Sequence, residues 1–316
     1  MRTAFLIGAG GFVGSNVAAS LLEAGWQVHA FGPATPLVHS VKLSERIMRT
    51  EGSVEDRAGM EAAMTASGAE IVISFAAYSA GSTGLARAGE EDPDRAMAVN
   101  VDGFRKTLEA ALATGIRRVV WSSSTTVYGP ADLYPRQPVD EDAMLRPRLT
   151  YGLTKAMAEQ IAVFFRDRHG LEVCSVRLPL VFGPGLWYDG AAASLMATLR
   201  SARPGARHVL EGHGASFDLM YVPDAAAAFV ALAEADGPLA DRYNVNGFTT
   251  RFADIVATIG RAVPGYDVEF REVAPALIFP LISSERIVRD IGFRPKFDLE
   301  LAVQHHVKEL NSLETR

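Results

Sequence analysis

A glycine-rich turn close to the amino terminus constrains the fold of this chain most. Residues 2–7 form a short apolar run that predicts a buried strand, and Gly8, Gly11 and Gly14 follow it directly. A helical pattern then continues to Ala24. In this order Gly8 permits a tight turn, Gly11 allows a phosphate to approach the backbone, and Gly14 allows helix and strand to pack closely. The segment predicts a dinucleotide bound at a helix N-terminus, and an ordinary strand-to-helix turn is the alternative.

The rest of the chain alternates strand-like and helical segments. Strands are predicted at residues 26–31, 69–75, 118–122, 173–178 and 242–245, and helices at 57–67, 94–114, 150–169 and 224–235. Such alternation is typical of a parallel sheet covered by helices on both faces. We expect an α/β fold: a Rossmann doubly wound parallel sheet with a smaller C-terminal α/β substrate domain. The expected nucleotide domain comprises residues 1–178, with 220–247 returning to it, and the substrate domain comprises 179–219 and 248–316.

Composition narrows the choice of partners. The chain has 316 residues, 48% of them hydrophobic, and a formal net charge of −6 without a basic stripe. This charge argues against nucleic acid or an anionic membrane and leaves a small-molecule substrate as the expected partner. One cysteine, Cys174, excludes an internal disulfide and suits a cytoplasmic protein. No apolar run reaches the length of about 18 residues that predicts a membrane helix, and no metal site is predicted.

A tyrosine and a lysine four residues apart form the second informative feature. Tyr151 and Lys155 fall within a predicted helix, where residues at this spacing share one face. A free tyrosine has a pKa near ~10, and a nearby ammonium group lowers it by favouring the phenolate. Such a pair can exchange a proton with an alcohol or carbonyl oxygen. The alternative is a chance pairing at the start of an amphipathic helix.

Six short blocks, in order along the chain, carry a family resemblance. They are Gly8-x-x-Gly11-x-x-Gly14, Ser-Phe-Ala-Ala at 74–77, Asn-Val-Asp-Gly at 100–103, Ser-Ser-Ser-Thr-Thr-Val-Tyr-Gly at 122–129, Tyr151-x-x-x-Lys155 and Arg-Leu-Pro-Leu-Val-Phe-Gly-Pro at 177–184. With these blocks the chain resembles the extended short-chain dehydrogenase/reductases, in particular the NAD-dependent epimerase/dehydratases and, among them, the sugar 4-epimerases. The resemblance implies an NAD(P)-dependent enzyme that transfers hydride to or from a secondary alcohol carbon of a sugar-like substrate.

The resemblance also implies roles for individual residues. Tyr151 would be the acid/base, Lys155 would bind the nicotinamide ribose and lower the tyrosine pKa, and Ser124 would hydrogen-bond the reacting oxygen. The implied cofactor-binding residues are Gly8, Gly11, Phe12, Val13, Gly14, Ser53, Val54, Phe75, Ala76, Ala77, Asn100, Ser122, Tyr151, Lys155, Leu178 and Pro179. The implied substrate-binding residues are Tyr78, Ser79, Ser124, Thr125, Leu180 and Phe217.

Departures from the family pattern reduce the number of reactions that fit the sequence. Related dehydratases carry an Asp-Glu pair where Thr125 and Thr126 stand, so a dehydratase is not expected. Simple oxidoreduction and epimerisation through a transient ketone both remain open, and so does a dinucleotide sensor without catalysis. Intact Tyr151 and Lys155 count against the sensor, which has no need of them.

Two further departures concern the substrate. Leu180 and Phe217 stand where nucleotide-sugar 4-epimerases usually carry an asparagine and an arginine that hold the diphosphate. An unphosphorylated sugar, sugar acid, polyol or apolar secondary alcohol is therefore an open alternative to a nucleotide sugar. Arg200, Arg203 and Arg207 lie close in sequence and could replace the missing donors, or be solvated charges at a helix end.

The expected cofactor is NAD, with NADP left open. An NAD site normally has an acid about 20 residues past the glycines, but here no acid lies between Glu23 and Glu45, and the first cation is Lys42. Ser53 stands where relatives contact adenine, although Ser53 with Asp56 also predicts a helix cap. We expect a homodimer, because the helices at 94–114 and 150–169 resemble those that pair across a two-fold axis in relatives.

Overall fold

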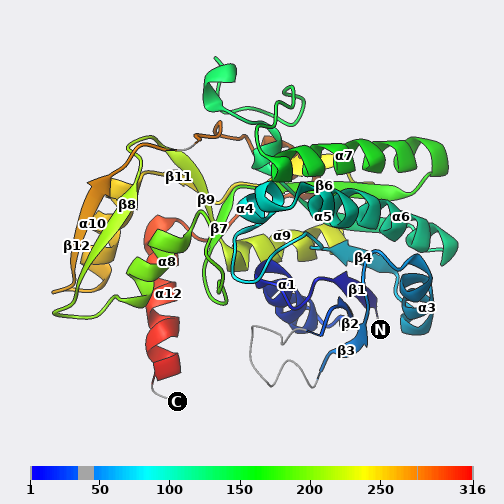
Figure 1. Cartoon of the computed structure of the whole chain (residues 1–316). Coiled ribbons are helices and arrows are strands. Elements are labelled where there is room, and N and C mark those ends of the chain that lie inside the picture. Colours follow the sequence, from blue (N-terminus) through cyan, green and yellow to red (C-terminus); the bar gives the residue numbers. More distant parts are fainter. Residues whose placement is uncertain (1, 35–45, 276, 315–316) are drawn as a thin grey trace.

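A parallel sheet forms the centre of the protein (Figure 1). The structure, a computed structural model, describes residues 2–34, 46–275 and 277–314. The sheet has seven strands in the order β10-β6-β5-β4-β1-β2-β3. Their bounds are β1 Thr3–Ile7, β2 Gln27–Gly32, β3 Met48–Glu51, β4 Ile71–Ser74, β5 Arg118–Ser124, β6 Glu172–Leu178 and β10 Arg242–Asn244. Every pairing between them is parallel, which confirms the expected Rossmann architecture.

The predicted strands all occur, with ends that differ from the prediction by one or two residues. Strand β3 was not predicted, because it lies at the edge of the sheet and most of its side chains are exposed. Its sequence therefore lacks the apolar run that marks a strand buried on both faces.

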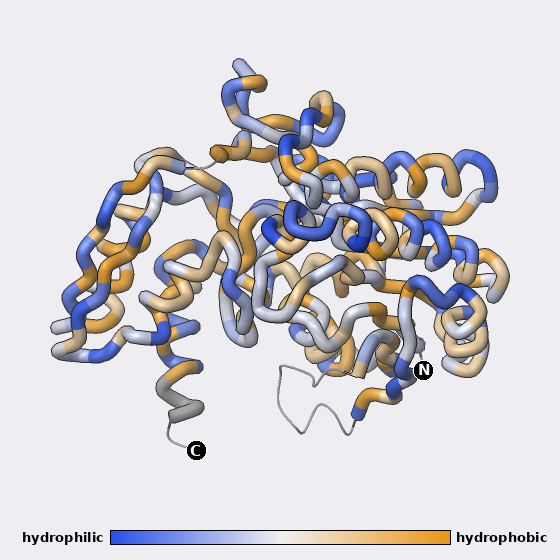
Figure 2. The backbone as a smooth tube through the Cα atoms, in the orientation of Figure 1, coloured by the Kyte–Doolittle hydropathy of each residue, from blue (hydrophilic) through white to orange (hydrophobic). Residues whose placement is uncertain are grey.

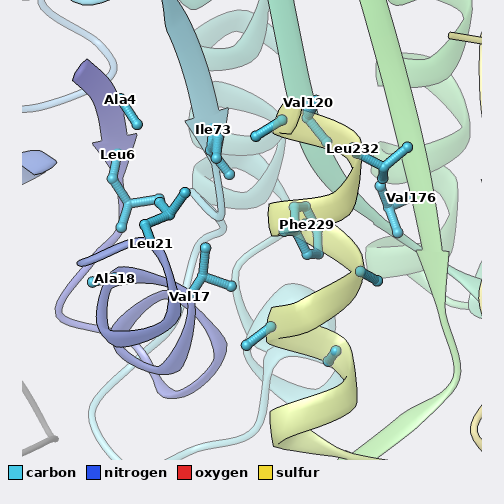
Figure 3. Close-up of a cluster of buried hydrophobic side chains, with 14 of the residues drawn as sticks. Ala4, Leu6, Val17, Ala18, Leu21, Ile73, Val120, Val176, Phe229 and Leu232 are labelled. Carbon is cyan, nitrogen blue, oxygen red and sulfur yellow. The ribbon is translucent and has the colours of Figure 1, made fainter. Parts of the chain in front are cut away.

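Helices α1 (Phe12–Glu23) and α9 (Val222–Glu234) cover one face of the sheet. Val17 and Leu21 of α1 and Phe229 of α9 lie against apolar side chains of β1, β4, β5 and β6 (Figure 3). Full burial of each such side chain contributes about 1.5–3 kcal/mol. This packing holds the start of α1, and with it the glycine turn, against the sheet.

Helices α3 (Arg57–Ser67), α6 (Gly103–Ala113) and α7 (Thr150–His169) supply the buried side chains of the opposite face. Phe104 of α6 stacks on Trp121 of β5, with 4.3 Å between ring centroids. The bounds of α3 and α7 are those that the sequence predicted. Within the described residues, no helix combines the length and the apolarity that a transmembrane segment needs.

The helix predicted at residues 94–114 is confirmed as a helical segment, but a π-helical turn interrupts its α-helical pattern. The segment consists of α5 (Pro93–Met97), a π-helical turn η1 (Ala98–Asp102) and α6. A π turn accommodates one extra residue per turn, and such turns are frequent at functional sites. The polar residue at its centre, Asn100, is 4% exposed, and the next subsection describes its contacts.

Outside the large sheet, the chain forms two smaller sheets. One sheet has the order β11-β9-β7 and the other pairs β12 with β8. The strands are β7 Leu180–Phe182, β8 Arg207–Gly212, β9 Phe217–Tyr221, β11 Phe248–Thr250 and β12 Asp267–Glu272, and the helices are α8 Ala193–Arg200, α10 Phe252–Ala262, α11 Glu285–Ile291 and α12 Leu299–Glu314. A separate hydrophobic cluster joins these elements, apart from α11, whose Ile287 packs into the core of the large sheet.

A buried histidine in α12 makes the fold sensitive to acid. His306 is 1% exposed, and neither ring nitrogen has a hydrogen-bond partner among the described residues. Burial lowers its pKa to about 4, and Arg200 and His305 add to the decrease. Since the unfolded chain binds this proton more readily, stability is fully present above the unfolded pKa near 6.5 and falls as the pH drops towards 4.

Replacing His306 with leucine should remove this acid sensitivity. A difference of about 2.5 pH units corresponds to roughly 3 kcal/mol at pH 4, at about 1.4 kcal/mol per unit. Urea unfolding measured from pH 7 to 4 should therefore show a shallower loss of stability in His306→Leu than in the parent. The same substitution at His208, on β8, serves as the control for loss of a histidine elsewhere in the fold.

Candidate active site

The candidate site lies at the carboxyl edge of the large sheet, where the strand order changes direction. Strand β1 has β2 on one side and β4 has β5 on the other, so the connections that follow β1 and β4 leave in opposite directions at this point. Ligands of open α/β sheets bind in the crevice at such a switch point. Gly8 follows β1 and Phe75 follows β4, and a Cβ atom added to Gly8 would lie 3.2 Å from the Phe75 carbonyl carbon.

The glycines of the turn bring its backbone close to α1 and to the end of β4, without side chains in between. Gly8 has φ +80°, and its carbonyl accepts a hydrogen bond from the Gly11 N–H at 3.0 Å. A Cβ atom at Gly14 would lie 2.2 Å from the Gly8 oxygen, so α1 could not pack this closely on the turn. Helix α1 begins at the buried Phe12 and the half-buried Val13, with no side-chain cap and no acidic residue in its first turn. These features fit a dinucleotide pyrophosphate, because the N–H groups of a helix N-terminus attract an anion.

The structure brings Tyr151 and Lys155 together on the first turns of α7. The Lys155 Nζ atom lies 5.5 Å from the centroid of the Tyr151 ring and 5.1 Å from that of Trp121. It donates a hydrogen bond to the Ser122 carbonyl at 2.8 Å. Lys155 is 2% exposed, whereas Tyr151 is only half-buried and remains open to a ligand.

The pKa of Tyr151 differs from the sequence-based expectation. Burial, with a smaller contribution from Tyr188, raises the pKa of the phenol above its ordinary value rather than lowering it. Burial also lowers the pKa of Lys155 to about 7, against an opposing contribution from Glu159. The phenol therefore does not have the lowered pKa that the sequence suggested, because desolvation disfavours the phenolate in this state.

Ser124 ends β5 beside this pair. Its hydroxyl accepts hydrogen bonds from the Thr126 N–H at 3.2 Å and the Thr126 hydroxyl at 3.0 Å, and Thr125 is 7% exposed. A Cβ atom at Gly152 would lie 2.5 Å from the Thr126 carbonyl oxygen. The start of α7 therefore packs tightly on the turn that follows β5, so that Tyr151 lies on a helix held close to the strand that ends at Ser124.

Asn100 connects the segment after β4 with α7. Its Oδ1 atom accepts a hydrogen bond from the Tyr78 N–H at 2.7 Å, and its Nδ2 atom donates to the Thr154 hydroxyl at 3.0 Å. That hydroxyl donates to the Tyr151 carbonyl at 2.9 Å. Asn100 therefore positions Tyr78 and the helix turn of Tyr151, and its own contacts are to protein atoms.

Several expected cofactor residues have other contacts. The ring of Phe75 packs at a tilt on Phe229 with 4.5 Å between centroids, Val54 is buried, and Ser53 accepts a hydrogen bond from the Glu55 N–H at 3.1 Å. The expected cap formed by Ser53 together with Asp56 is wrong in part, because Asp56 alone is the N-cap of α3. The remaining residues lie at strand ends: Ala76 and Ala77 are half-buried after β4, the buried Leu178 is the last residue of β6, and the buried Pro179 follows it.

Strand β3 supplies a carboxylate next to the end of β2, where the adenosine part of the cofactor is expected. The sequence analysis did not identify this residue. Glu51 stands in register with Gly32, the last residue of β2, and its side chain is exposed. The Gly52 N–H donates to the Gly32 carbonyl at 3.0 Å, which fixes this register. Glu51 was missed because β3 was not predicted. Lys42 and Glu45 lie outside the described residues.

The expected substrate residues lie on several elements. Leu180 begins β7 and is half-buried, while Ser79 is exposed. The ring of Phe217 packs on Phe252 with 4.6 Å between centroids and on His213 with 5.5 Å. Phe217 therefore belongs to an aromatic cluster of the C-terminal part.

The three arginines considered as phosphate ligands have different surroundings. Arg200 donates to the Leu186 carbonyl, and Arg207 pairs with Asp267 at 2.7 Å on the surface. Arg203 is exposed in the loop between α8 and β8. Two of the three candidate donors are thus engaged with the protein itself.

An aromatic residue near Tyr151 was missed. Tyr188 contacts Phe12 edge to face, with 6.5 Å between centroids, and contributes to the raised pKa of Tyr151. Its segment is fixed by a hydrogen bond from the Asp189 N–H to the Ser82 carbonyl at 2.7 Å. It lies in an irregular Gly-Pro-rich stretch without periodicity, so no sequence signal marked it. The described residues contain no group of three or more His, Cys, Asp or Glu side chains that could hold a metal ion.

Comparison with known proteins decides the family. A model of the NAD dependent epimerase/dehydratase family matches residues 4–246. The chain belongs to this family. The chain is 28% identical over 277 residues to a UDP-glucose 4-epimerase of Mycolicibacterium smegmatis, and the aligned region covers 84% of each chain. The chain is also 26% identical to a mitochondrial L-threonine 3-dehydrogenase of Sus scrofa. That alignment covers 68% of this chain but only 59% of the length of the relative.

A solved structure of the epimerase/dehydratase family confirms the fold. The UDP-glucose 4-epimerase of Thermotoga maritima, solved with UDP-glucose, superposes with a TM-score of 0.85 at 22% identity and covers 99% of this chain and 100% of its own. The resemblance to extended short-chain dehydrogenase/reductases is therefore confirmed.

Proposed function

We propose that the protein is an NAD(P)-dependent oxidoreductase that transfers hydride to or from a secondary alcohol carbon, with Tyr151 as the acid/base. The observation that carries this proposal is the position of Tyr151 and Lys155, which face each other on α7 with 5.5 Å between the Nζ atom and the ring centroid. Ser124 ends the neighbouring strand. These groups follow strands of the same parallel sheet as the glycine turn, whose carboxyl ends meet at one edge.

The chain's own residues handle the proton. The Tyr151 hydroxyl takes the proton of an alcohol, or returns it to a carbonyl oxygen, while the Ser124 hydroxyl holds that oxygen. Lys155 favours the phenolate through its positive charge. The bound dinucleotide would supply the hydride acceptor or donor, held by the glycine turn and the N-terminus of α1. Proton transfer of this kind is typically worth about 10²- to 10⁴-fold in rate.

The substrate that fits best is an unphosphorylated secondary alcohol. Leu180 and Phe217 lack charge, and Arg200 and Arg207 bind protein atoms, so the usual strong donors to a diphosphate are missing. The half-buried Tyr188 beside Phe12 adds an apolar wall. We propose that residues 179–219 and 248–316 form the substrate domain, since most of their apolar side chains share one cluster.

Epimerisation is the second candidate, because the relative that matches 84% of both chains is an epimerase. The two functions differ in the fate of the cofactor. An epimerase returns the hydride to its own substrate and retains the dinucleotide, whereas a dehydrogenase releases it after each turnover. Native mass spectrometry of the purified protein, followed by a panel of sugars and secondary alcohols with NAD and NADP, tests both. An empty protein that consumes cofactor supports oxidoreduction, and a protein that retains cofactor without net consumption supports the epimerase.

We propose NAD as the cofactor. Glu51 lies on the strand next to β2, in register with Gly32, and takes the place of the acid that usually ends that strand. A carboxylate there would accept hydrogen bonds from ribose hydroxyls and repel a 2′-phosphate.

We propose that the protein forms a homodimer through α6 and α7. A surface pocket lined by Leu112, Ile161 and Phe164 lies near the end of α7 opposite to Tyr151. Phe164 is 57% and Leu153 47% exposed, and hydrophobic positions recur along α7 among hydrophilic ones (Figure 2). Such exposed apolar side chains on one helix favour burial against a second copy.

Introducing a charge at Phe164 should separate the dimer. Burial of an aspartate without a partner would cost more than the interface gains from the ring. Light scattering should give twice the chain mass for the parent and the single mass for Phe164→Asp. The control Leu301→Asp changes a similarly exposed residue of α12 and should stay dimeric. A parent that is monomeric at working concentration would contradict the proposal.

A further inference from the structure

The three serines that end β5 use their hydroxyl protons differently. The Ser122 hydroxyl donates to the Ser123 carbonyl at 3.2 Å. The Ser123 hydroxyl donates at 2.6 Å to the buried carboxylate of Glu159, which Arg177 of β6 also holds through bonds of 2.9 Å and 2.6 Å. The half-buried Ser124 finds no acceptor for its proton among the described residues. That proton is therefore available to a bound molecule.

One residue, Thr126, occupies the acceptor positions of the Ser124 oxygen. The Thr126 N–H donates to this oxygen at 3.2 Å, and the Thr126 hydroxyl donates to it at 3.0 Å. In the part of the chain that the structure describes, the Thr126 hydroxyl has no other partner, so its proton stays on this bond. A serine hydroxyl has two lone pairs and one proton. Because both lone pairs are used, Ser124 can offer a ligand only its proton.

The backbone of Thr126 is held from the other side by the helix that carries Tyr151. Thr126 lies in η2 (Thr125–Val127), a 3-10 turn directly after β5. A Cβ atom at Gly152, the residue after Tyr151, would lie 2.5 Å from the Thr126 carbonyl oxygen. Thr126 therefore contacts Ser124 with its side chain and the first turn of α7 with its backbone. These are the two groups between which the reacting oxygen lies in the proposed function.

A secondary alcohol can meet a serine hydroxyl in two ways. Its oxygen can accept the serine proton, or it can donate its own proton to the serine oxygen, which leaves a base with no proton to take. We propose that Thr126 is a positioning residue that excludes the second arrangement, so that a bound alcohol turns its O–H bond towards Tyr151. When this bond breaks, the proton moves to the Tyr151 oxygen and hydride leaves the carbon for the dinucleotide. The inference rests on the proposed function, in which Ser124 binds the reacting oxygen.

Replacing Thr126 with valine tests this inference, because valine has nearly the same shape and keeps the backbone N–H but lacks the hydroxyl. One lone pair of Ser124 becomes free, and an alcohol can then also bind in the unproductive arrangement. Such binding lowers kcat and KM by the same factor. It leaves kcat/KM unchanged, since this ratio compares the transition state with free enzyme and free substrate. We expect a joint fall of about three- to tenfold in alcohol oxidation, the factor that one hydrogen bond gives.

The ketone formed from the same alcohol provides the internal control. A ketone has no O–H proton to donate, so its reduction by Thr126→Val should keep the parental kcat and KM. A merely structural role of Thr126 would instead lower kcat/KM in both directions. Thr126→Ser retains the hydroxyl and should restore the parental constants for oxidation. Thr126→Ala removes the hydroxyl without adding a methyl group and should repeat the joint fall, which keeps the test decisive if the valine variant does not fold.

Steady-state kinetics with the best secondary alcohol of the panel and with its ketone give these constants. Parental constants for alcohol oxidation in Thr126→Val and Thr126→Ala, or a fall of kcat/KM in both directions, would overturn the inference. Tyr151→Phe in the same assay separates this failure from that of the proposed function. A slow Tyr151→Phe protein beside a parental Thr126→Val protein overturns the inference alone, whereas parental turnover by Tyr151→Phe overturns both.

Discussion

Replacing Tyr151 with phenylalanine should lower kcat about 10²- to 10⁴-fold while leaving the affinity for the dinucleotide nearly unchanged. The substitution removes the hydroxyl that is proposed to exchange the proton, and proton transfer of this kind accounts for a rate factor of that size. The ring, which lies 5.5 Å from Lys155 Nζ, remains in place. Turnover with the best substrate of the panel and dinucleotide binding by calorimetry give the two readouts.

Tyr266 provides a matched control for this experiment. Its hydroxyl donates to the Thr198 carbonyl at 2.8 Å in the C-terminal part of the fold. Tyr266→Phe therefore removes one buried hydrogen bond, worth about 1 kcal/mol of stability, without touching the proposed site. A Tyr151→Phe protein that turned over at the parental rate would exclude Tyr151 as the acid/base.

Replacing Arg177 with methionine should destabilise the protein by about 3–5 kcal/mol, the usual cost of breaking a buried pair. Burial opposes the charge of Arg177, but Glu159 more than offsets it and raises the pKa of the guanidinium above its ordinary value. The variant would leave Glu159 buried with the Ser123 hydroxyl alone. Urea unfolding at pH 7 measures the loss.

The surface pair of Arg207 and Asp267 shows how far this cost depends on burial. Its side chains are 83% and 59% exposed at a separation of 2.7 Å. Arg207→Met should change stability by less than about 1 kcal/mol, since water screens and replaces the lost contact. Equal effects at the two positions would contradict a role of burial in the Arg177 pair.

The sequence predicted the large sheet well because local pattern and tertiary environment agree there. Strands such as β1 are buried on both faces and read as apolar runs, and α7 matches its predicted bounds. The edge strand β3 and the small C-terminal strands lack this pattern, since exposed positions interrupt it. The π turn at Asn100 could not be predicted, because the one extra residue that it accommodates does not change the helix-forming composition of the segment.

The candidate site was only partly predictable for a related reason. The glycine turn, Tyr151 and Lys155 depend on local spacing, which a sequence displays. Tyr188 and Arg177 contact residues of distant segments, and such contacts cannot be predicted from the spacing of residues along the chain. The side chain of Glu159 could have been noticed, since Tyr151, Lys155 and Glu159 recur every four residues on one helix face.

The bond between Ser82 and Asp189 has a consequence for access to Tyr151. It joins two loops that are separated by more than a hundred residues, and Thr83 and Asp189 extend it as a short parallel bridge. Neither loop can move outward alone without breaking this hydrogen bond and the bridge beside it. The two loops are therefore expected to move together, so that an insertion in either loop should also change the mobility of the other.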